Sequence, residues 1–215
     1  MTRRPLPFPL PLPRRVAARS PSRARRGVVV ALAVAAVFLG VAHAAAQTPS
    51  AAQTPAAAQT PEERLAALGI ELPAPPAPVA NYVRAVTTGN LVFLAGHVPR
   101  DEGGEIVRGK LGADLDVEQG AAAARLTAIA LLASLRAEIG SLDRVARVVR
   151  VTGMVNSTPE FDQQPAVING CSDLIVEVFG ERGKHARSAV GMVSLPLQAA
   201  VEIEMVVEVA EPAGG

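Results

Sequence analysis

Arg187 is the residue whose type and surroundings most clearly suggest chemistry. It stands near the start of the stretch 185–196, and the next stretch, 201–209, carries Glu202 and Glu204 among alternating apolar residues. This alternation predicts two β-strands joined by a Leu-Pro turn, and strands that bury one face usually keep charge at their ends or on the wet face. An arginine at the end of one strand, with carboxylates on the neighbouring strand, would be suited to bind a small carboxylic acid. The alternative is an edge hairpin with a solvated charged face.

The elements that must position these residues occupy residues 79–210. Turn residues and apolar spacing predict strands at 82–86 and 91–95, a short third strand at 106–108, a helix ending near residue 139, a strand at 145–155, a helical region that starts at Thr158 and is interrupted by Pro165, and the two C-terminal strands. The order is β-β-(β)-α-β-α-β-β. It predicts an α+β fold in which two helices pack on one face of a mixed sheet.

Two helix starts carry a capping signature. Asp116, three residues before Gln119, predicts the start of the long helix, and Gly140 predicts its end. Upstream, the Thr-Pro-Glu-Glu segment at 60–63 provides an N-cap, a proline at the first helical position and a glutamate at the third. It predicts a short helix at 61–69.

The first 46 residues have the composition of an export signal. Residues 1–26 are rich in arginine and proline, and an uncharged, largely apolar run at 27–46 ends in Ala-x-Ala sequences that could be cleaved. We therefore expect a signal peptide and a periplasmic or extracellular protein. The segment 27–46 could instead stay as a membrane anchor, although its continuous apolar part, 27–42, is slightly short of the roughly 20 apolar residues that a span needs. Arg25-Arg26 permits twin-arginine export, and an organelle transit peptide is a further alternative.

Residues 47–78 cannot build a core. Ala-Ala-Gln-Thr-Pro occurs three times at a period of six, and a proline-rich connector follows at 72–78. We interpret this region as a linker that contains the short helix at 61–69. The folded domain then spans 79–210, and 211–215 is predicted to be a disordered tail.

Charge is distributed unequally along the chain. Eight of the 21 basic residues precede residue 47, which leaves 13 basic against 20 acidic residues, a net charge of −7, in the remainder. So acidic a body is a poor general binder of phosphate backbones, and no nucleic-acid partner is expected. The lone cysteine, Cys171, excludes an internal disulfide. Past residue 46 the histidines are His97 and His185, without a ligand cluster, so a metal site is not expected.

The folded domain contains several short motifs: Ala186-Arg-Ser-Ala-Val190, the Leu195-Pro196 turn, Val201-Glu-Ile-Glu204, Asn81-Tyr-Val83, Gly89-Asn90 and Leu94-Ala-Gly-His-Val-Pro99. Together they resemble the RidA (YjgF) family of imine deaminases, historically labelled L-PSP endoribonucleases. The resemblance implies a chorismate-mutase-like fold, assembled as a homotrimer with clefts between subunits. Asn169–Leu174 and Val178–Gly180 are closest to a longer, less characterised branch of the family.

The resemblance also implies roles for individual residues. Arg187 would grip the substrate carboxylate, and Glu202 would help to position or activate the attacking water. Gly96 would let the backbone approach the ligand, and the other substrate-binding candidates are Tyr82, His97 and Asn169. Glu204 shares a face with Glu202, so the two could exchange roles. Ala95 replaces the hydroxyl-bearing residue that characterised deaminases tend to have, which leaves the substrate range open.

The implied reaction is hydrolysis of an enamine or imine tautomer of a 2-amino acid to a 2-keto acid and ammonium. The protonated imine is already electrophilic, so the protein mainly orients it and supplies water, without a metal or organic cofactor. His97 is either an acid/base in the cleft or a hydrogen-bonded residue at a strand end. Two other functions stay open: a non-catalytic binder of small carboxylates, and an endoribonuclease or translation inhibitor. The acidic body and the few aromatic residues oppose the endoribonuclease.

Overall fold

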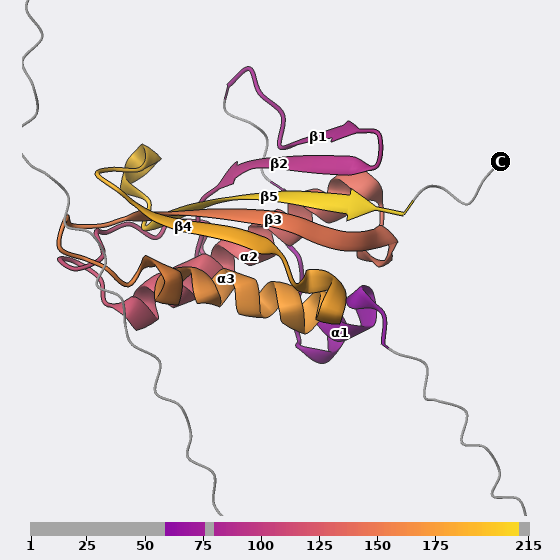
Figure 1. Ribbon diagram of the computed structural model, residues 1–215, viewed down its shortest axis with the longest axis horizontal. Helices are drawn as coiled ribbons and strands as arrows, with labels where there is room; N and C mark the ends of the chain where they lie inside the picture. The colour runs from indigo at the N-terminus through magenta and orange to yellow at the C-terminus, as the bar shows by residue number, and fades with distance from the viewer. Residues whose placement is uncertain (1–58, 76–79, 211–215) are drawn as a thin grey trace, which may run out of the picture. The chain divides into compact units, whose positions relative to one another are not determined.

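The computed structural model describes residues 59–75 and 80–210. The expected export signal or anchor, linker residues 47–58 and 76–78, and the predicted tail at 211–215 lie outside these residues. The strands are β1 (Ala85–Thr88), β2 (Leu91–His97), β3 (Val145–Asn156), β4 (Ala186–Met192) and β5 (Val201–Val209), and the helices are α1 (Pro61–Ala67), α2 (Val117–Ile139) and α3 (Gln164–Phe179). The strands form one sheet in the order β1-β2-β5-β3-β4 (Figure 1).

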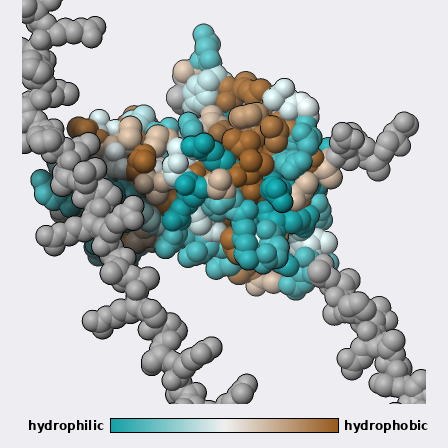
Figure 2. Space-filling view, viewed as in Figure 1, coloured by the Kyte–Doolittle hydropathy of each residue, from teal (hydrophilic) through white to brown (hydrophobic). Residues whose placement is uncertain are grey.

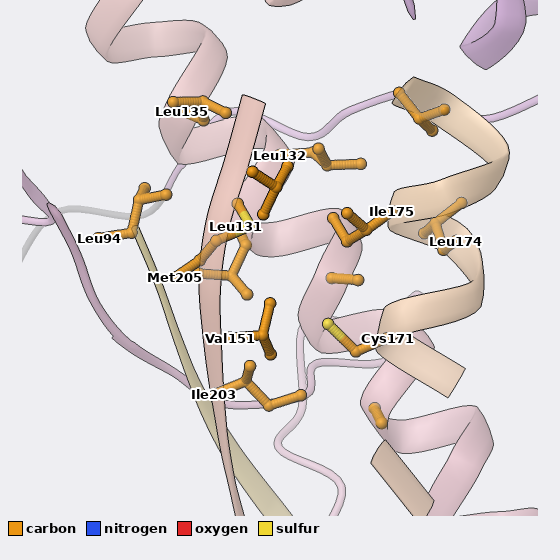
Figure 3. Close-up of a cluster of buried hydrophobic side chains, with 14 of the residues drawn as sticks. Leu94, Leu131, Leu132, Leu135, Val151, Cys171, Leu174, Ile175, Ile203 and Met205 are labelled. Carbon is orange, nitrogen blue, oxygen red and sulfur yellow. The ribbon is translucent and has the colours of Figure 1, made fainter. Parts of the chain in front are cut away.

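The sheet is mixed, and two helices cover one of its faces. Strand β4 runs parallel to β3, and the other neighbouring strands are antiparallel. Figure 1 shows α2 and α3 side by side beneath the sheet. Leu131 and Leu132 from α2 and Ile175 from α3 meet Val151 and Met205 from the sheet in an aliphatic core (Figure 3). The predicted α+β fold, with two helices on one face of a mixed sheet, is confirmed.

Helix α2 begins and ends where its capping residues predict. The Asp116 side chain accepts from the Gln119 backbone, the Gln119 side chain accepts from the Asp116 backbone, and Gly140 closes the helix at a φ of 85°. A side chain at Gly170 of α3 would overlap the Ala121 carbonyl of α2, so the two helices pack closely. By length and composition α2 could cross a membrane, but 56% of its most apolar window is buried, as in a core helix.

The short helix α1 packs against the folded domain. It has the predicted capping box between Thr60 and Glu63. Its Glu62 carboxylate accepts from the Leu142 backbone at 3.0 Å, and its Glu62 backbone donates to the Asp143 carboxylate at 3.1 Å. Leu65 is 2% exposed. These contacts make α1 part of the packed unit.

Three local predictions differ from the structure. The first strand, predicted at 82–86, is β1 at Ala85–Thr88. Residues 106–108 make isolated bridges, Arg100 with Ile106 and Arg108 with Ala199, instead of a third strand. The residues after Thr158 form a turn, and α3 starts at Gln164 with Pro165 in its first turn. Pro165 therefore begins the helix and does not interrupt it, because the first-turn backbone N–H that proline lacks has no helical partner anyway.

The pairing of the two C-terminal strands is the main correction. They do not form the predicted hairpin, because β5 lies between β2 and β3 while β4 lies on the far side of β3. The connection from β3 through α3 to β4 is a parallel crossover, which places β4 at the sheet edge. The chain then passes over the end of β3 to reach the centre of the sheet. Local alternation predicts that a segment is a strand and leaves its partner open.

Candidate functional site

Arg187 lies on the edge strand β4 and reaches back to α3. It pairs with Val151, whose side chain is buried against the helices, so Arg187 leaves the sheet on the helix side. Its Nη1 donates to Asn169 Oδ1 at 2.9 Å and to Ser172 Oγ at 3.0 Å. Its Nη2 donates to the Pro165 carbonyl at 3.4 Å. The structure thus joins two of the candidate substrate-binding residues, Arg187 and Asn169, by a direct hydrogen bond.

The guanidinium of Arg187 keeps an open edge. Among the described residues its Nε makes no hydrogen bond, and no ion pair within 59–75 and 80–210 involves Arg187. The residue is exposed. Nε and Nη2 share the edge whose two parallel N–H groups fit the two oxygens of a carboxylate. An arginine that is held at Nη1 and open at Nε is suited to bind a small acid.

Glu202 lies on the other face of the sheet, beside Gly96. Strand β2 changes register against β5 between Leu94 and His97, and this irregularity brings Gly96 against the Glu202 side chain. A Cβ at Gly96 would overlap the carboxylate oxygen, so glycine here leaves the space that the Glu202 side chain occupies. Partial burial, and then the charge of neighbouring Glu204, raise the pKa of Glu202. A carboxyl with a raised pKa is a better proton acceptor and donor near neutral pH.

Arg187 and Glu202 do not meet within one chain. Glu202 pairs with Met154 on β3, and Arg187 pairs with Val151, an odd number of residues away. Because side chains alternate along a strand, the guanidinium and the carboxylate project from opposite faces. The site expected from the sequence is divided into an arginine half, on the side of α3, and a carboxylate half, on the open face.

The two remaining candidates lie in different surroundings. His97 is 6% exposed and faces α2, where its Nε2 lies 2.7 Å from Ser134 Oγ. Of its two alternatives, the hydrogen-bonded strand-end residue describes this position and the cleft acid/base does not. Tyr82 is 47% exposed and precedes β1, and its segment is tied to β2 by the bond from the Ala95 N–H to the Arg84 carbonyl. The next residue, Val83, lines a hollow on the open face together with Glu204.

The open face of the sheet is apolar around a shallow hollow. The hollow, of about 310 Å³, is lined by Val83, Val86, Phe93, Arg150, Thr152 and Glu204 among others. Figure 2 shows apolar side chains gathered over β1 and β2. Val86 and Phe93 are 53% and 44% exposed, far more than large apolar residues in a monomer's core. The carboxylate half thus borders a surface suited to contact with another chain.

Three polar residues beside the candidates had no role in the site predicted from the sequence. Ser172 contacts Arg187, and His185 contacts Ser172, with Nε2 3.0 Å from its Oγ. Arg150 donates to Thr152 and Ser188 on the open face, at 3.4 Å each. Spacing could have revealed the first, because Ser172 is three residues from Asn169 and thus on the same face of a helix. Among the described residues, no three His, Cys, Asp or Glu side chains are grouped as a metal site.

Comparison with known proteins places the chain in a family. Residues 62–209 match the family model described as "YjgF/chorismate mutase-like, putative endoribonuclease". The protein TCP17 of Trypanosoma cruzi is 48% identical over 145 residues, which are 67% of this chain and 91% of that protein. The match begins within α1, in agreement with its packing on the domain.

Solved structures agree. A protein of unknown function from Agrobacterium tumefaciens, Atu1372, is 44% identical, with a TM-score of 0.64 over 70% of this chain and 92% of that one. A structure described as a putative endoribonuclease from Shewanella oneidensis is 34% identical, with a TM-score of 0.68 over 70% of this chain and all of that one. The chain therefore belongs to the YjgF family, the RidA family that its motifs resemble, and has its chorismate-mutase-like α+β fold.

Proposed function

We propose that this protein is an enamine/imine deaminase that hydrolyses 2-imino acids to 2-keto acids and ammonium. The single observation that carries the proposal is Arg187, a guanidinium clamped by α3 and open at Nε, without an acidic partner among the described residues. A 2-imino acid presents a planar carboxylate next to its reacting carbon. A bidentate pair with Arg187 would fix both the position and the plane of that carbon.

Glu202 would handle the protons of the reaction. Water adds to the C=N carbon of the protonated imine as the Glu202 carboxylate takes one of its protons. Glu202 then gives that proton to the amino nitrogen, the C–N bond breaks to release ammonia, and Glu202 takes the hydroxyl proton as the keto group forms. Ammonia takes up this proton and leaves as ammonium. The raised pKa of Glu202, caused first by burial and then by Glu204, suits this exchange. No redox partner is needed, because the atoms and charges of imine and water balance those of keto acid and ammonium.

A complete site would combine two copies of the chain. Arg187 and Glu202 project from opposite faces, so one small ligand can touch both only if they come from different subunits. The exposed apolar residues of the open face, including Val86 and Phe93, provide a surface on which a neighbour could pack. We therefore propose a homotrimer with the ligand in the clefts between subunits, the arginine half from one subunit and the carboxylate half from the next.

The first experiment removes the arginine. An amino-acid oxidase would generate the 2-imino acid, and semicarbazide would trap whatever imine the protein has not yet hydrolysed. We expect the wild-type protein to lower the semicarbazone yield, and Arg187→Ala to lose at least about a hundredfold of that activity, since a bidentate charge-assisted pair disappears. Arg187→Lys is the matched control that keeps the charge without the fork. Wild-type turnover in Arg187→Ala, with the assembly intact by light scattering, would refute the proposal.

The second experiment tests whether the site is shared. Arg187→Ala and Glu202→Gln chains, each inactive alone, are co-expressed in equal amounts. Random assembly of trimers would give about a quarter of the wild-type rate, because roughly three quarters of the trimers are mixed and each of these has one complete cleft of three. If both residues acted within one chain, every mixture would stay inactive.

A carboxylate-binding protein without catalysis is the second candidate. The open edge of Arg187 favours it, because binding needs the arginine half alone. Calorimetry with 2-oxobutanoate would distinguish the two: binding that depends on Arg187, without imine turnover, supports the binder. An endoribonuclease is less favoured, because the chain after residue 46 carries a net charge of −7. Ribonuclease activity that co-purifies with the protein at high salt would favour it again.

Export is part of the proposal. The uncharged, largely apolar run at 27–46 after an arginine-rich start is typical of a signal peptide, or of an anchor if it is not cleaved. Fractionation of cells that express the full chain, followed by mass spectrometry of the mature N-terminus, tests it. A soluble extracytoplasmic protein that begins near residue 47 is expected, whereas an intact N-terminus in the membrane fraction indicates an anchor.

A further inference from the structure

Arg187 is the end of a chain of hydrogen bonds that runs from the backbone through two side chains. His185 Nδ1 lies 2.6 Å from the Gly183 carbonyl, and His185 Nε2 lies 3.0 Å from Ser172 Oγ. Ser172 Oγ in turn lies 3.0 Å from Arg187 Nη1. Gly183 is buried and ends the turn after α3, so the chain of bonds starts from a fixed point.

The donor and the acceptor of each hydrogen bond in this chain follow from the chemistry of the groups. A carbonyl only accepts, so Nδ1 of His185 carries the proton and donates to Gly183. Nε2 of the neutral ring is then an acceptor, and the Ser172 hydroxyl donates to it. The Ser172 oxygen then accepts a hydrogen bond from Nη1 of Arg187, because a guanidinium can only donate. Burial, opposed by the Gly183 bond and aided by the Arg187 charge, lowers the pKa of His185, in agreement with a neutral ring.

The chain of bonds determines which edge of the guanidinium a ligand can use. Nη1 is occupied by Asn169 and Ser172, and Nη2 gives one long bond to Pro165. Nε and the second hydrogen of Nη2 stay available among the described contacts. They form one planar fork, which fits a carboxylate in the plane of the guanidinium.

We propose that Ser172 and His185 are positioning residues that hold Arg187 with its Nε edge turned toward the carboxylate of the ligand. This inference rests on the proposed function for the identity of the ligand, but the bond chain itself can be tested without it. Neither residue touches the ligand. Their effect is to keep a long, flexible side chain in one orientation, so that little of its freedom is lost when the acid binds.

A competing interpretation treats Ser172 and His185 as a nucleophile and its base. A hydroxyl that donates to an imidazole Nε2, with Nδ1 held by an acceptor, has that arrangement. In the structure, however, the Ser172 oxygen already accepts from a cation, which weakens it as a nucleophile. The two interpretations differ in kinetics. Loss of positioning raises KM or Kd, whereas loss of a nucleophile abolishes kcat.

The first test reads the bond chain directly, in the full-length protein labelled with 15N in histidine and arginine. We expect His185 to show the neutral Nδ1–H form and Arg187 to show slow rotation of its guanidinium. Ser172→Ala should shift the Nε2 resonance of His185 and speed the rotation of Arg187, whereas Ser172→Thr, which keeps the hydroxyl, should change neither. If Ser172→Ala leaves both signals as in the wild type, the proposal is overturned.

The second test measures affinity for 2-oxobutanoate by calorimetry and, where turnover exists, KM and kcat. Ser172→Ala should weaken binding about tenfold with kcat nearly unchanged, since one of the bonds to a charged group is lost. Ser172→Thr should bind as the wild type does. Asp173→Ala, an exposed neighbour on α3, is the control for general effects on the helix.

The outcomes separate the two proposals. Failure of the wild-type protein to bind or process the acid refutes the proposed function, and the NMR arm still decides the role of Ser172. Equal affinity in Ser172→Ala and the wild type overturns the positioning role even if turnover is intact. Loss of kcat at unchanged KM in Ser172→Ala also overturns it, in favour of the nucleophile.

Discussion

Two histidines in this protein make the same pair of contacts, with a backbone carbonyl and a serine, in different surroundings. His97 has Nδ1 at 2.7 Å from the carbonyl two residues earlier, Ala95, and Nε2 at 2.7 Å from Ser134 on α2. His185 has Nδ1 at 2.6 Å from the carbonyl two residues earlier, Gly183, and Nε2 at 3.0 Å from a serine on α3. The first pair is closed within the core, whereas the second continues to an exposed arginine.

The difference shows that a local motif does not define its role. At His97, the serine bond ties the irregular end of β2 to α2, at the point where Gly96 approaches Glu202. Burial is the largest cause of the lowered pKa of His97, and the charge of Arg84 adds to it. The hydrogen bond to the Ala95 carbonyl opposes this change. At His185, the neutral ring accepts from the Ser172 hydroxyl, and the Ser172 oxygen accepts from Arg187. We therefore expect the first pair to govern stability and the second to govern ligand affinity.

The largest effect should follow from His97→Ala. The substitution leaves a cavity in the core and a buried Ser134 without its partner, and each of these destabilises. We expect the free energy of unfolding to fall by about 3 kcal/mol, measured by urea titration of the wild type and the variant. His97→Gln, which can keep one polar contact, is the matched control and should lose less. A stability within about 0.5 kcal/mol of the wild type would remove the contrast between the two histidines.

His185→Ala should affect binding more than stability. The ring is half-buried beside the surface, so we expect unfolding to change by no more than about 1 kcal/mol. The Ser172 hydroxyl loses its acceptor, and the affinity for 2-oxobutanoate should fall roughly fivefold because Arg187 is less well held. Calorimetry on the same preparation used for the urea titration gives both values. A stability loss as large as that of His97→Ala would make the two pairs equivalent.

The smallest expected effect is in the pH dependence of stability. Both histidines have a lowered pKa, with burial as the leading cause. In the unfolded chain an imidazole binds a proton below a pH of about 6.5. Below that pH the unfolded state therefore holds more protons than the folded state, and stability falls as the pH drops. Above that pH both states are neutral, and stability does not depend on these groups. His97→Gln should remove more of this acid loss than His185→Gln, because His97 is more deeply buried. Urea midpoints at pH 7.5, 6 and 5 test the order, and the reverse order would contradict it.

The sequence by itself determined most of the helix and strand positions and much of the family assignment. Capping residues such as Asp116 and Gly140 act within one turn of helix, and alternating apolar residues mark strands such as β3 without reference to any partner. The motif around Arg187 identified the residue with the open guanidinium. These features depend on neighbours in the chain, which a sequence records.

The tertiary structure alone decided which strands are neighbours and therefore which residues share a face. Strands β4 and β5 are consecutive in sequence but are separated by β3, because the crossover through α3 places β4 at the edge. That arrangement puts Arg187 and Glu202 on opposite faces and gives Arg187 its partners Ser172 and His185. Side-chain alternation makes each strand's faces predictable, but long-range pairing selects which faces meet, and no local pattern encodes it.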